Sequence, residues 1–184
     1  MPDGRAVVKT AASRAFFSRG TGLRTSHIFT TADGAAQGLT GTTEFAPDAE
    51  VPWHTHNCEE TVTIVEGEAL FEADGEQTEL VAGDATWTPV GVVHRFANRG
   101  RGPLRILWTY GSVDATRTLV ATGATTSIAA ESQANPAATL NIQGPAEADL
   151  LPSQPGCRVR TPARLRYEPG TRQSPPSNRE RGSH

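Results

Sequence analysis

The fold of this chain is decided by two segments, HTHNCEETVTIVEG (54–67) and GDATWTPVGVVHRFAN (83–98). Residues two apart in a β-strand point to the same face of the sheet. A strand through the start of the first segment therefore places the imidazoles of His54 and His56 side by side. Such a pair of neighbouring nitrogens is a ready set of two metal ligands.

Two further potential ligands follow this pair. Turn-prone and polar residues separate His56 from Glu60, so Glu60 is expected to open the next strand and to face back toward the histidines. His94 arrives from a third strand. Three neutral nitrogens and one carboxylate suit a divalent first-row metal ion, and such a set leaves one or two octahedral positions open. The segments therefore predict a metal cage built on β-strands.

The spacing of these residues resembles both signature motifs of the cupins, a family of small antiparallel β-barrels. The two segments read H-x-H-x3-E-x6-G and G-x5-P-x-G-x2-H-x3-N. One position departs from the family pattern, because Asp48 stands where cupins usually carry a glycine, in an entry turn outside the cage. The resemblance covers residues 20–125 and implies one bound divalent ion, either Fe, Mn, Zn or Ni. The ligands that it implies are His54, His56, Glu60 and His94.

The number of histidines favours this interpretation over a chance arrangement. A single strand histidine is more often a packed or surface residue than a ligand, and the alternative here is a vestigial site. The chain has five histidines, of which three lie in the two segments. His27 lies outside them and is expected to be a strand residue without a role in the site.

Short strands separated by turn residues predict the fold class. Nearly every connection contains Gly, Pro, Asp or Asn, and helical periodicity is missing from this region. The pattern indicates an all-β fold, and the resemblance makes it an antiparallel jelly-roll barrel, or double-stranded β-helix. The predicted strands are His27 to Thr31, Thr40 to Ala46, Trp53 to His56, Glu60 to Val65, Glu68 to Asp74, Gln77 to Val81, Thr86 to Thr88, Val92 to Asn98 and Leu104 to Tyr110.

Composition divides the chain into three parts. We predict a flexible N-terminal arm over residues 1–19, the barrel over 20–125, and a disordered tail over 126–184. The tail is rich in Pro, Ala, Ser and Arg, and eight of the thirteen prolines lie at or beyond Pro136. Such a composition buries too little apolar surface to offset the entropy of ordering. The segment 112–123 is transitional and is expected to add a last strand to the barrel or to a second subunit.

Charge and hydropathy limit the partners. Residues 151–184 carry seven Arg and two Glu, so the rest of a chain with net charge −3 is acidic. An acidic barrel disfavours nucleic acid, whose phosphates need a basic patch. No apolar run approaches the about 18 residues that span a bilayer, and two distant cysteines suggest no disulfide framework. We expect a cytoplasmic protein that binds a small molecule and forms a homodimer, as an exposed edge strand invites pairing.

Strand alternation predicts the surroundings of the cage. Val62 and Ile64 share the face of Glu60, and the bulkier face of the last strand carries two aromatic residues. Tyr110 is the candidate for a proton-transfer residue, and ordinary core packing is the alternative role of the aromatic residues. The predicted substrate pocket consists of Phe96, Trp108, Tyr110, Val62 and Ile64.

Three functions remain open at this stage. The favoured one is an oxygenase of the dioxygenase type, because an apolar, aromatic-lined interior suits an enol or phenol and excludes water. The second is redox-neutral isomerisation, cyclisation or decarboxylation, with the metal as a Lewis acid. The third is non-catalytic binding of a ligand or metal. Phosphosugar chemistry is disfavoured, because Lys9 lies outside the barrel and the core-strand arginines are expected to point outward.

Overall fold

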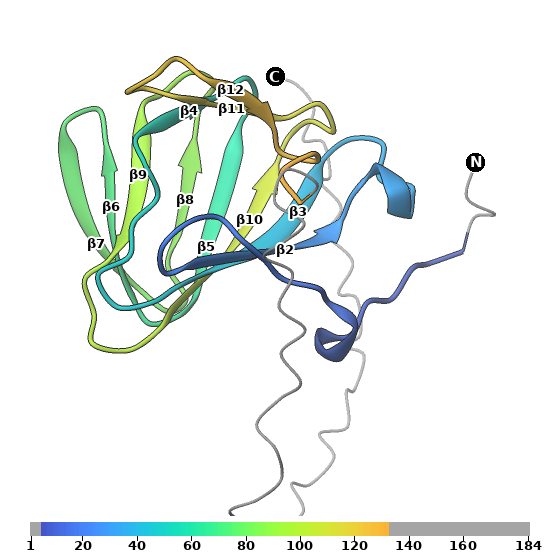
Figure 1. Ribbon diagram of the computed structural model, residues 1–184, viewed down its shortest axis with the longest axis horizontal. Helices are drawn as coiled ribbons and strands as arrows, with labels where there is room; N and C mark the ends of the chain where they lie inside the picture. The colour runs from blue at the N-terminus through green and yellow to red at the C-terminus, as the bar shows by residue number, and fades with distance from the viewer. Residues whose placement is uncertain (1–4, 133–184) are drawn as a thin grey trace, which may run out of the picture. The chain divides into compact units, whose positions relative to one another are not determined.

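The structure is a computed structural model that describes residues 5–132 (Figure 1), all within one compact unit. These residues form strands and two short 3-10 helices, Ala11–Ser13 and Thr31–Asp33. No helix in this part of the chain is long and apolar enough to cross a membrane. The strands are β1 (Phe17–Ser18), β2 (Leu23–Phe29), β3 (Leu39–Phe45), β4 (His54–His56), β5 (Glu60–Glu66), β6 (Glu68–Ala73), β7 (Glu76–Val81), β8 (Ala85–Thr88), β9 (His94–Asn98), β10 (Leu104–Tyr110), β11 (Thr116–Leu119) and β12 (Thr125–Ser127).

The strands form two antiparallel sheets of six strands each. The first sheet has the order β1-β2-β3-β10-β5-β8, and the second has the order β12-β11-β4-β9-β6-β7. Non-consecutive neighbours in both sheets mean that the chain crosses repeatedly from one sheet to the other, as a jelly roll requires (Figure 1). The predicted all-β jelly-roll fold is confirmed.

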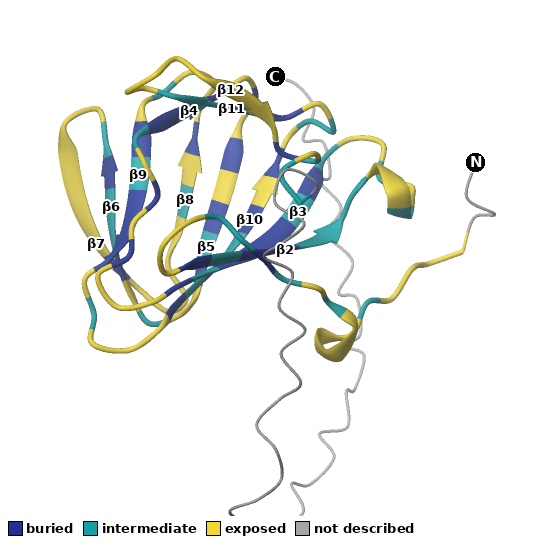
Figure 2. Cartoon of the chain, in the orientation of Figure 1, coloured by how far each residue is buried: buried dark blue, intermediate teal, exposed yellow. Residues whose placement is uncertain are grey.

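The core lies between the two sheets and follows the predicted alternation. Val62, Ile64 and Phe96 are buried, as are the four alternating residues of β10 from Leu104 to Tyr110 (Figure 2). Figure 2 shows the buried segments on the strands of both sheets, with exposed residues at the turns. Because these strands present a continuous apolar face to each other, the interior is walled on both sides by regular, hydrogen-bonded structure.

The predicted strand boundaries were wrong mainly at β2. This strand begins at Leu23, whereas the sequence analysis placed its start at His27. The first half was missed because Arg24, Thr25 and Ser26 lack the apolar alternation of the other strands. Thr25 and Ser26 are nevertheless both buried, and β1 pairs with this end of β2. The predicted last strand within residues 112–123 is confirmed as β11, which pairs with β4.

The predicted domain limits stay predictions. Strands are present from Phe17 to Ser127, slightly beyond the limits of 20 and 125 set from composition. The predicted flexible arm is described only from residue 5. Of the predicted disordered tail, residues 133–184 lie outside the part of the chain that the structure describes.

The one departure from the motif pattern is accommodated by the backbone. Asp48 lies exposed in a turn and has a φ of 62°, in the left-handed region that glycine adopts freely. Aspartate is among the residues that tolerate this region best, because its short side chain can hydrogen-bond locally. The entry turn before β4 therefore keeps a left-handed residue without a glycine.

Candidate metal centre

Three histidines converge in the interior. His54 and His56 lie at alternate positions of β4, and His54 is the cross-strand partner of His94 in β9. The three ring pairs have centroid separations of 4.4 to 5.4 Å, and one nitrogen of each ring lies within 4.8 Å of the others. All three side chains are buried. We call this group the three-histidine cluster.

Backbone carbonyls fix the orientation of each ring. The Nδ1 atoms lie 2.7 Å from Pro52 O for His54, 2.8 Å from Thr116 O for His56, and 2.9 Å from Val92 O for His94. A carbonyl oxygen only accepts, so each Nδ1 carries the proton and donates it. In the neutral imidazole the lone pair is then on Nε2, which is the state of a metal-binding histidine.

Glu60 reaches the cluster from the other sheet. Its Oε2 lies 2.9 Å from Nε2 of His94, and its Oε1 lies 3.8 Å from Nε2 of His56. The Nδ1 of His94 faces Val92 O, so Nε2 is the ring atom that faces Glu60, and a cation held by both Nε2 and the carboxylate would suit this arrangement. The Nε2 of His56 is buried and has no hydrogen-bond partner among residues 5–132. The donor set therefore fits a divalent metal ion.

Burial prepares the cluster for a metal. It lowers the pKa of His54 to about 2 and that of His56 to about 4, so both rings are neutral at pH 7. Burial alone would raise the pKa of Glu60, but the hydrogen bond to His94 and the nearby imidazoles outweigh it and lower the pKa to about 2. Neutral imidazoles and an ionised carboxylate are the forms that bind metal ions.

Tyr110 lies next to the cluster, where the sequence places it. It is the cross-strand partner of Glu60, and its ring centroid lies 4.6 Å from that of His56. Burial raises the pKa of Tyr110 well above its ordinary value, so the hydroxyl is protonated at neutral pH and can donate a hydrogen bond. Thr88 pairs with Glu60 on the opposite side, and its buried Oγ1 has no partner within residues 5–132.

A buried arginine that the sequence analysis did not single out completes the surroundings of the cluster. Arg117 is the cross-strand partner of His56, so both side chains point to the same face of the sheet. It is only 6% exposed, and its Nη2 donates to the hydroxyl of Tyr110 over 3.5 Å. The prediction of outward-pointing arginines concerned the core strands that end at Tyr110, and it made no statement about Arg117. The polar strand around Arg117 carries no apolar alternation that reveals which face is buried.

The remaining predicted pocket residues line the interior further from the cluster. Trp108 packs against Tyr110 at 5.0 Å between ring centroids and donates its Nε1 hydrogen to Thr43 Oγ1 over 3.1 Å. Phe96 packs on Phe71, whose centroid lies 6.3 Å from that of His94. Val62 and Ile64 are buried in β5. A role of these residues in binding substrate stays a prediction.

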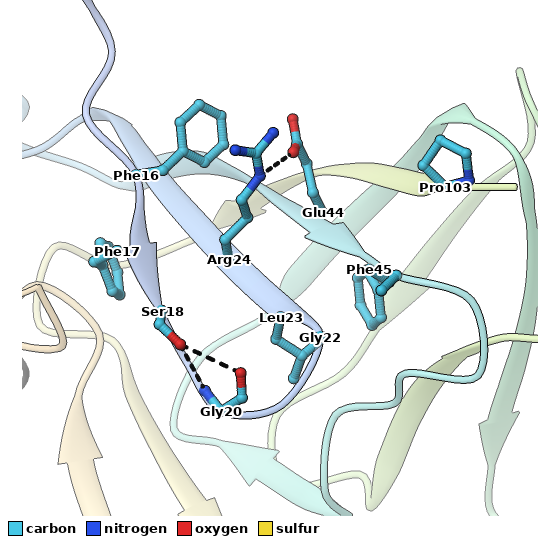
Figure 3. A pocket seen from close by; sticks show the side chains of 11 residues that line it. Phe16, Phe17, Ser18, Gly20, Gly22, Leu23, Arg24, Glu44, Phe45 and Pro103 are labelled. Atoms are coloured by element: carbon cyan, nitrogen blue, oxygen red, sulfur yellow. Dashed lines mark hydrogen bonds and ion pairs between the residues drawn. The ribbon is translucent and has the colours of Figure 1, made fainter. Parts of the chain in front are cut away.

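The structure also contains cavities away from the cluster. Figure 3 shows one cavity between the N-terminal arm and the first sheet, and its volume is about 430 Å³. In its lining, the guanidinium of Arg24 lies 4.8 Å from the ring centroid of Phe16 and pairs with Glu44. No residue of the three-histidine cluster lines it. A second cavity, of about 460 Å³, is bordered by Pro52, whose carbonyl holds His54, and by Arg117. It adjoins the wall of the metal centre.

Comparison of the sequence with known proteins finds a family match and a relative. The family model described as "Cupin domain" matches residues 41–110. The chain is 30% identical over 105 residues to the tetracenomycin polyketide synthase protein TcmJ of Streptomyces glaucescens, a match that covers 56% of this chain and 70% of that protein.

Solved structures agree in fold. The polyketide cyclase RemF from Streptomyces resistomycificus superimposes with a TM-score of 0.54 and 18% identity, over 67% of this chain and 86% of RemF. An RmlC-like cupin from Shewanella frigidimarina gives a TM-score of 0.52 and 21% identity, over 59% of this chain and 92% of that one. At such identities the likeness establishes the fold.

Proposed function

This chain belongs to the cupin family, and on that premise we propose that it is a metal-dependent enzyme that cyclises a polyketide-type substrate, a small molecule with several carbonyl groups. The reaction class is redox-neutral. The observation that carries the proposal is the convergence of three oriented histidines with a carboxylate and a protonated tyrosine in one buried interior. The relationship to a polyketide synthase protein supports the choice of substrate class.

The three histidines and Glu60 are proposed to hold one divalent ion. Its nitrogen ligands would be the Nε2 atoms, since the Nδ1 atoms are engaged by backbone carbonyls. A divalent ion bound there would act as a Lewis acid on a carbonyl oxygen of the substrate. The identity of the ion is left open, because the same nitrogen and oxygen ligands suit several first-row metals.

Proton transfer is assigned to two residues. Cyclisation of a 1,3-dicarbonyl segment removes a proton from the carbon between two carbonyls, forms a carbon–carbon bond to a third carbonyl carbon, and leaves the oxygen of that carbonyl needing a proton. We assign the removal to the ionised carboxylate of Glu60, through the oxygen not engaged with His94. The hydroxyl of Tyr110 holds the proton for the oxygen, and the apolar side chains of Val62 and Phe96 exclude water.

Redox-neutral chemistry is preferred to the oxygenase that the sequence favours. The same four ligands would serve both reactions, so the cage does not separate them. The named relatives with functional descriptions are a polyketide synthase protein and, for the fold alone, a polyketide cyclase. Non-catalytic ligand binding remains the alternative that the assay below must exclude.

The test is an incubation of the protein, purified without chelator, with a synthetic 3,5,7-trioxo ester, in which attack of C2 on the C7 carbonyl closes a six-membered ring, followed by mass spectrometry and an oxygen electrode. Cyclisation gives a product of unchanged mass or one lighter by a single water, without oxygen consumption. Products heavier by oxygen atoms, together with oxygen uptake, would establish an oxygenase instead. Saturable binding without any product would favour a binding protein. The matched variants are His54→Gln, expected to be inactive, and His27→Gln, which lies outside the cluster.

A further inference from the structure

A buried ion-pair network lies beside the three-histidine cluster. Glu131, in the turn that follows β12, accepts a hydrogen bond from Nη1 of Arg117, and its other oxygen lies 3.4 Å from Nε of Arg19. The side chains of Glu131 and Arg19 are about nine-tenths buried and that of Arg117 is more so. A carboxylate is therefore held between two guanidinium groups within reach of the site.

The segment that carries Glu131 is a short turn that packs on the core through Ile128 and Ala129. Ile128 is 1% exposed, and its N–H donates to Ala115 O over 2.9 Å. After Ile128 the chain turns, with the N–H of Glu131 donating to Ile128 O over 3.2 Å. Glu131 thus reaches Arg117 from a short turn rather than from a strand, and a turn can move away without breaking the pairing of a sheet.

One donor group of the Arg117 guanidinium, Nε, is not engaged by any residue from 5 to 132. A guanidinium presents five donors in a planar fork that matches a carboxylate. Glu131 and the hydroxyl of Tyr110 engage the two terminal nitrogens, while the buried Nε has no partner within residues 5–132. An unpartnered charged donor in the interior favours any ligand that brings further acceptor atoms.

The cavity of about 460 Å³ gives a ligand room at this point. Arg117, Leu119 and Glu131 line it together with Pro52. Arg117 and Leu119 are the cross-strand partners of His56 and His54, so the cavity follows the two rows of side chains that lead to the cluster. A molecule in this cavity can contact Arg117, whose guanidinium also reaches the hydroxyl of Tyr110 beside the three-histidine cluster.

We propose that Arg117 is the binding site for a carboxylate of the substrate, and that Glu131 occupies this site as an intramolecular stand-in. The proposal rests on the proposed function for its choice of a carbonyl compound, and it narrows the substrate class to oxo-carboxylic acids. The two arginines balance the charges of Glu60 and Glu131, so a bound divalent cation leaves a positive surplus that an anionic substrate would neutralise.

The test measures binding of acetoacetate, an oxo-carboxylate, to the full-length metal-loaded protein by isothermal calorimetry. Replacement of Glu131 by Gln removes the competing charge at nearly constant size, so more of the protein is competent to bind. We expect Glu131→Gln to bind acetoacetate about tenfold more tightly than the natural chain. Acetylacetone, a dicarbonyl without a carboxylate, is expected to show no such gain.

The matched control is Glu50→Gln. Glu50 also pairs with two arginines, at 2.8 Å from Arg95 and 3.0 Å from Arg99, but on the exposed surface. It should bind acetoacetate as the natural chain does. Glu131→Asp, which keeps the charge, should also bind as weakly as the natural chain, and Arg117→Gln should lose the gain when combined with Glu131→Gln.

Three results would overturn the proposal: equal affinity of the natural chain and Glu131→Gln, an equal gain in Glu50→Gln, or an equal gain for acetylacetone. The calorimetric readout is independent of turnover. Tighter acetoacetate binding with no cyclisation of either the 3,5,7-trioxo ester or the corresponding free carboxylate would refute the proposed function and leave the carboxylate site standing. Cyclisation, together with equal acetoacetate affinity of Glu131→Gln and the natural chain, would refute the carboxylate site alone.

Discussion

The three histidines owe their orientation to the backbone rather than to other side chains. For His54 and His94 the accepting carbonyl belongs to the residue two positions earlier, Pro52 and Val92 respectively. For His56 it belongs to Thr116 on the neighbouring strand. Thr116 lies in β11, and Pro52 and Val92 lie just before β4 and β9, so the backbone sets the ring orientations before any metal arrives. A ligand set of this kind loses little entropy on binding an ion.

Removal of one ring should abolish the effect of metal on stability. An ion that binds only the native state at 100 times its dissociation constant adds about 2.7 kcal/mol to the free energy of unfolding. We expect the natural chain to show a metal-dependent rise in Tm in calorimetry and His54→Ala to show none. The control, His27→Ala, should keep the rise. A metal-dependent rise that survives in His54→Ala would contradict the role of the cluster.

Acid should destabilise the metal-free protein before its carboxylates titrate. The folded-state pKa values of His54 and His56 lie at about 2 and about 4, below the ordinary 6.5, and burial lowers the pKa of His27 as well. The unfolded chain therefore binds more protons below pH 6.5, and the stability present above that pH is lost as the pH falls toward 4. Each ring contributes about 1.4 kcal/mol per pH unit in this range.

The measurement is urea denaturation of the chelator-treated protein from about pH 7.5 to about pH 5. The double variant His54→Gln, His56→Gln should show a flatter dependence, because the two rings with the most strongly lowered pKa values are gone. A free energy of unfolding that is constant over this range in the natural chain would show that the two rings are not buried in the neutral form.

At the scale of elements, the success of the sequence analysis follows the apolar alternation. β10 was predicted with both ends correct, because its bulky apolar residues Leu104, Ile106, Trp108 and Tyr110 occupy every second position and so share one face. The alternating histidines of β4 and the motif spacing likewise predicted which side chains meet. β11 lacks such alternation, and the burial of Arg117 depends on Glu131, which comes fourteen residues later. Such charge compensation arises from tertiary structure and leaves no local pattern.

The close contact between β3 and β10 leaves no room for a side chain at Gly41. Gly41 is the cross-strand partner of Trp108, and a Cβ at this position would lie 2.2 Å from Cζ2 of the indole. The indole is held by its hydrogen bond to Thr43 and by packing on Tyr110, so it cannot retreat freely. We expect Gly41→Ala to lower the free energy of unfolding by about 1–3 kcal/mol and to change the tryptophan fluorescence.

The matched control for Gly41→Ala is Gly102→Ala. A Cβ at Gly102 would meet nothing within 4 Å, and this glycine needs no positive φ. Its replacement should leave the urea midpoint and the fluorescence nearly unchanged. Equal stability of the two variants would mean that the indole of Trp108 has room to shift, and that the close packing of β3 on β10 is not required.

At the scale of the whole molecule, the described residues form two six-stranded sheets and a buried core between them. The last buried apolar residue among them is Ile128, and the last buried charge pair is that of Glu131 with Arg117. The predicted homodimer stays a prediction, as does the disorder of the tail beyond residue 132. The motif spacing and strand alternation predicted the fold and the three converging histidines, whereas the residues that close the site from β11 and from the turn after β12 required the three-dimensional structure.

The extent of the folding unit can be tested by two truncations. A chain that ends after Ser132 keeps every strand and Glu131, so we expect cooperative thermal unfolding at a Tm close to that of the full chain. A chain that ends after Ala124 loses β12, the buried Ile128 and the partner of Arg117. A buried charge left without its partner costs about 3–5 kcal/mol, so this second truncation should unfold at a clearly lower temperature. Loss of cooperativity already in the first truncation would show that residues beyond 132 contribute to the core, and equal stability of both would show that Arg117 does not need Glu131 to remain buried.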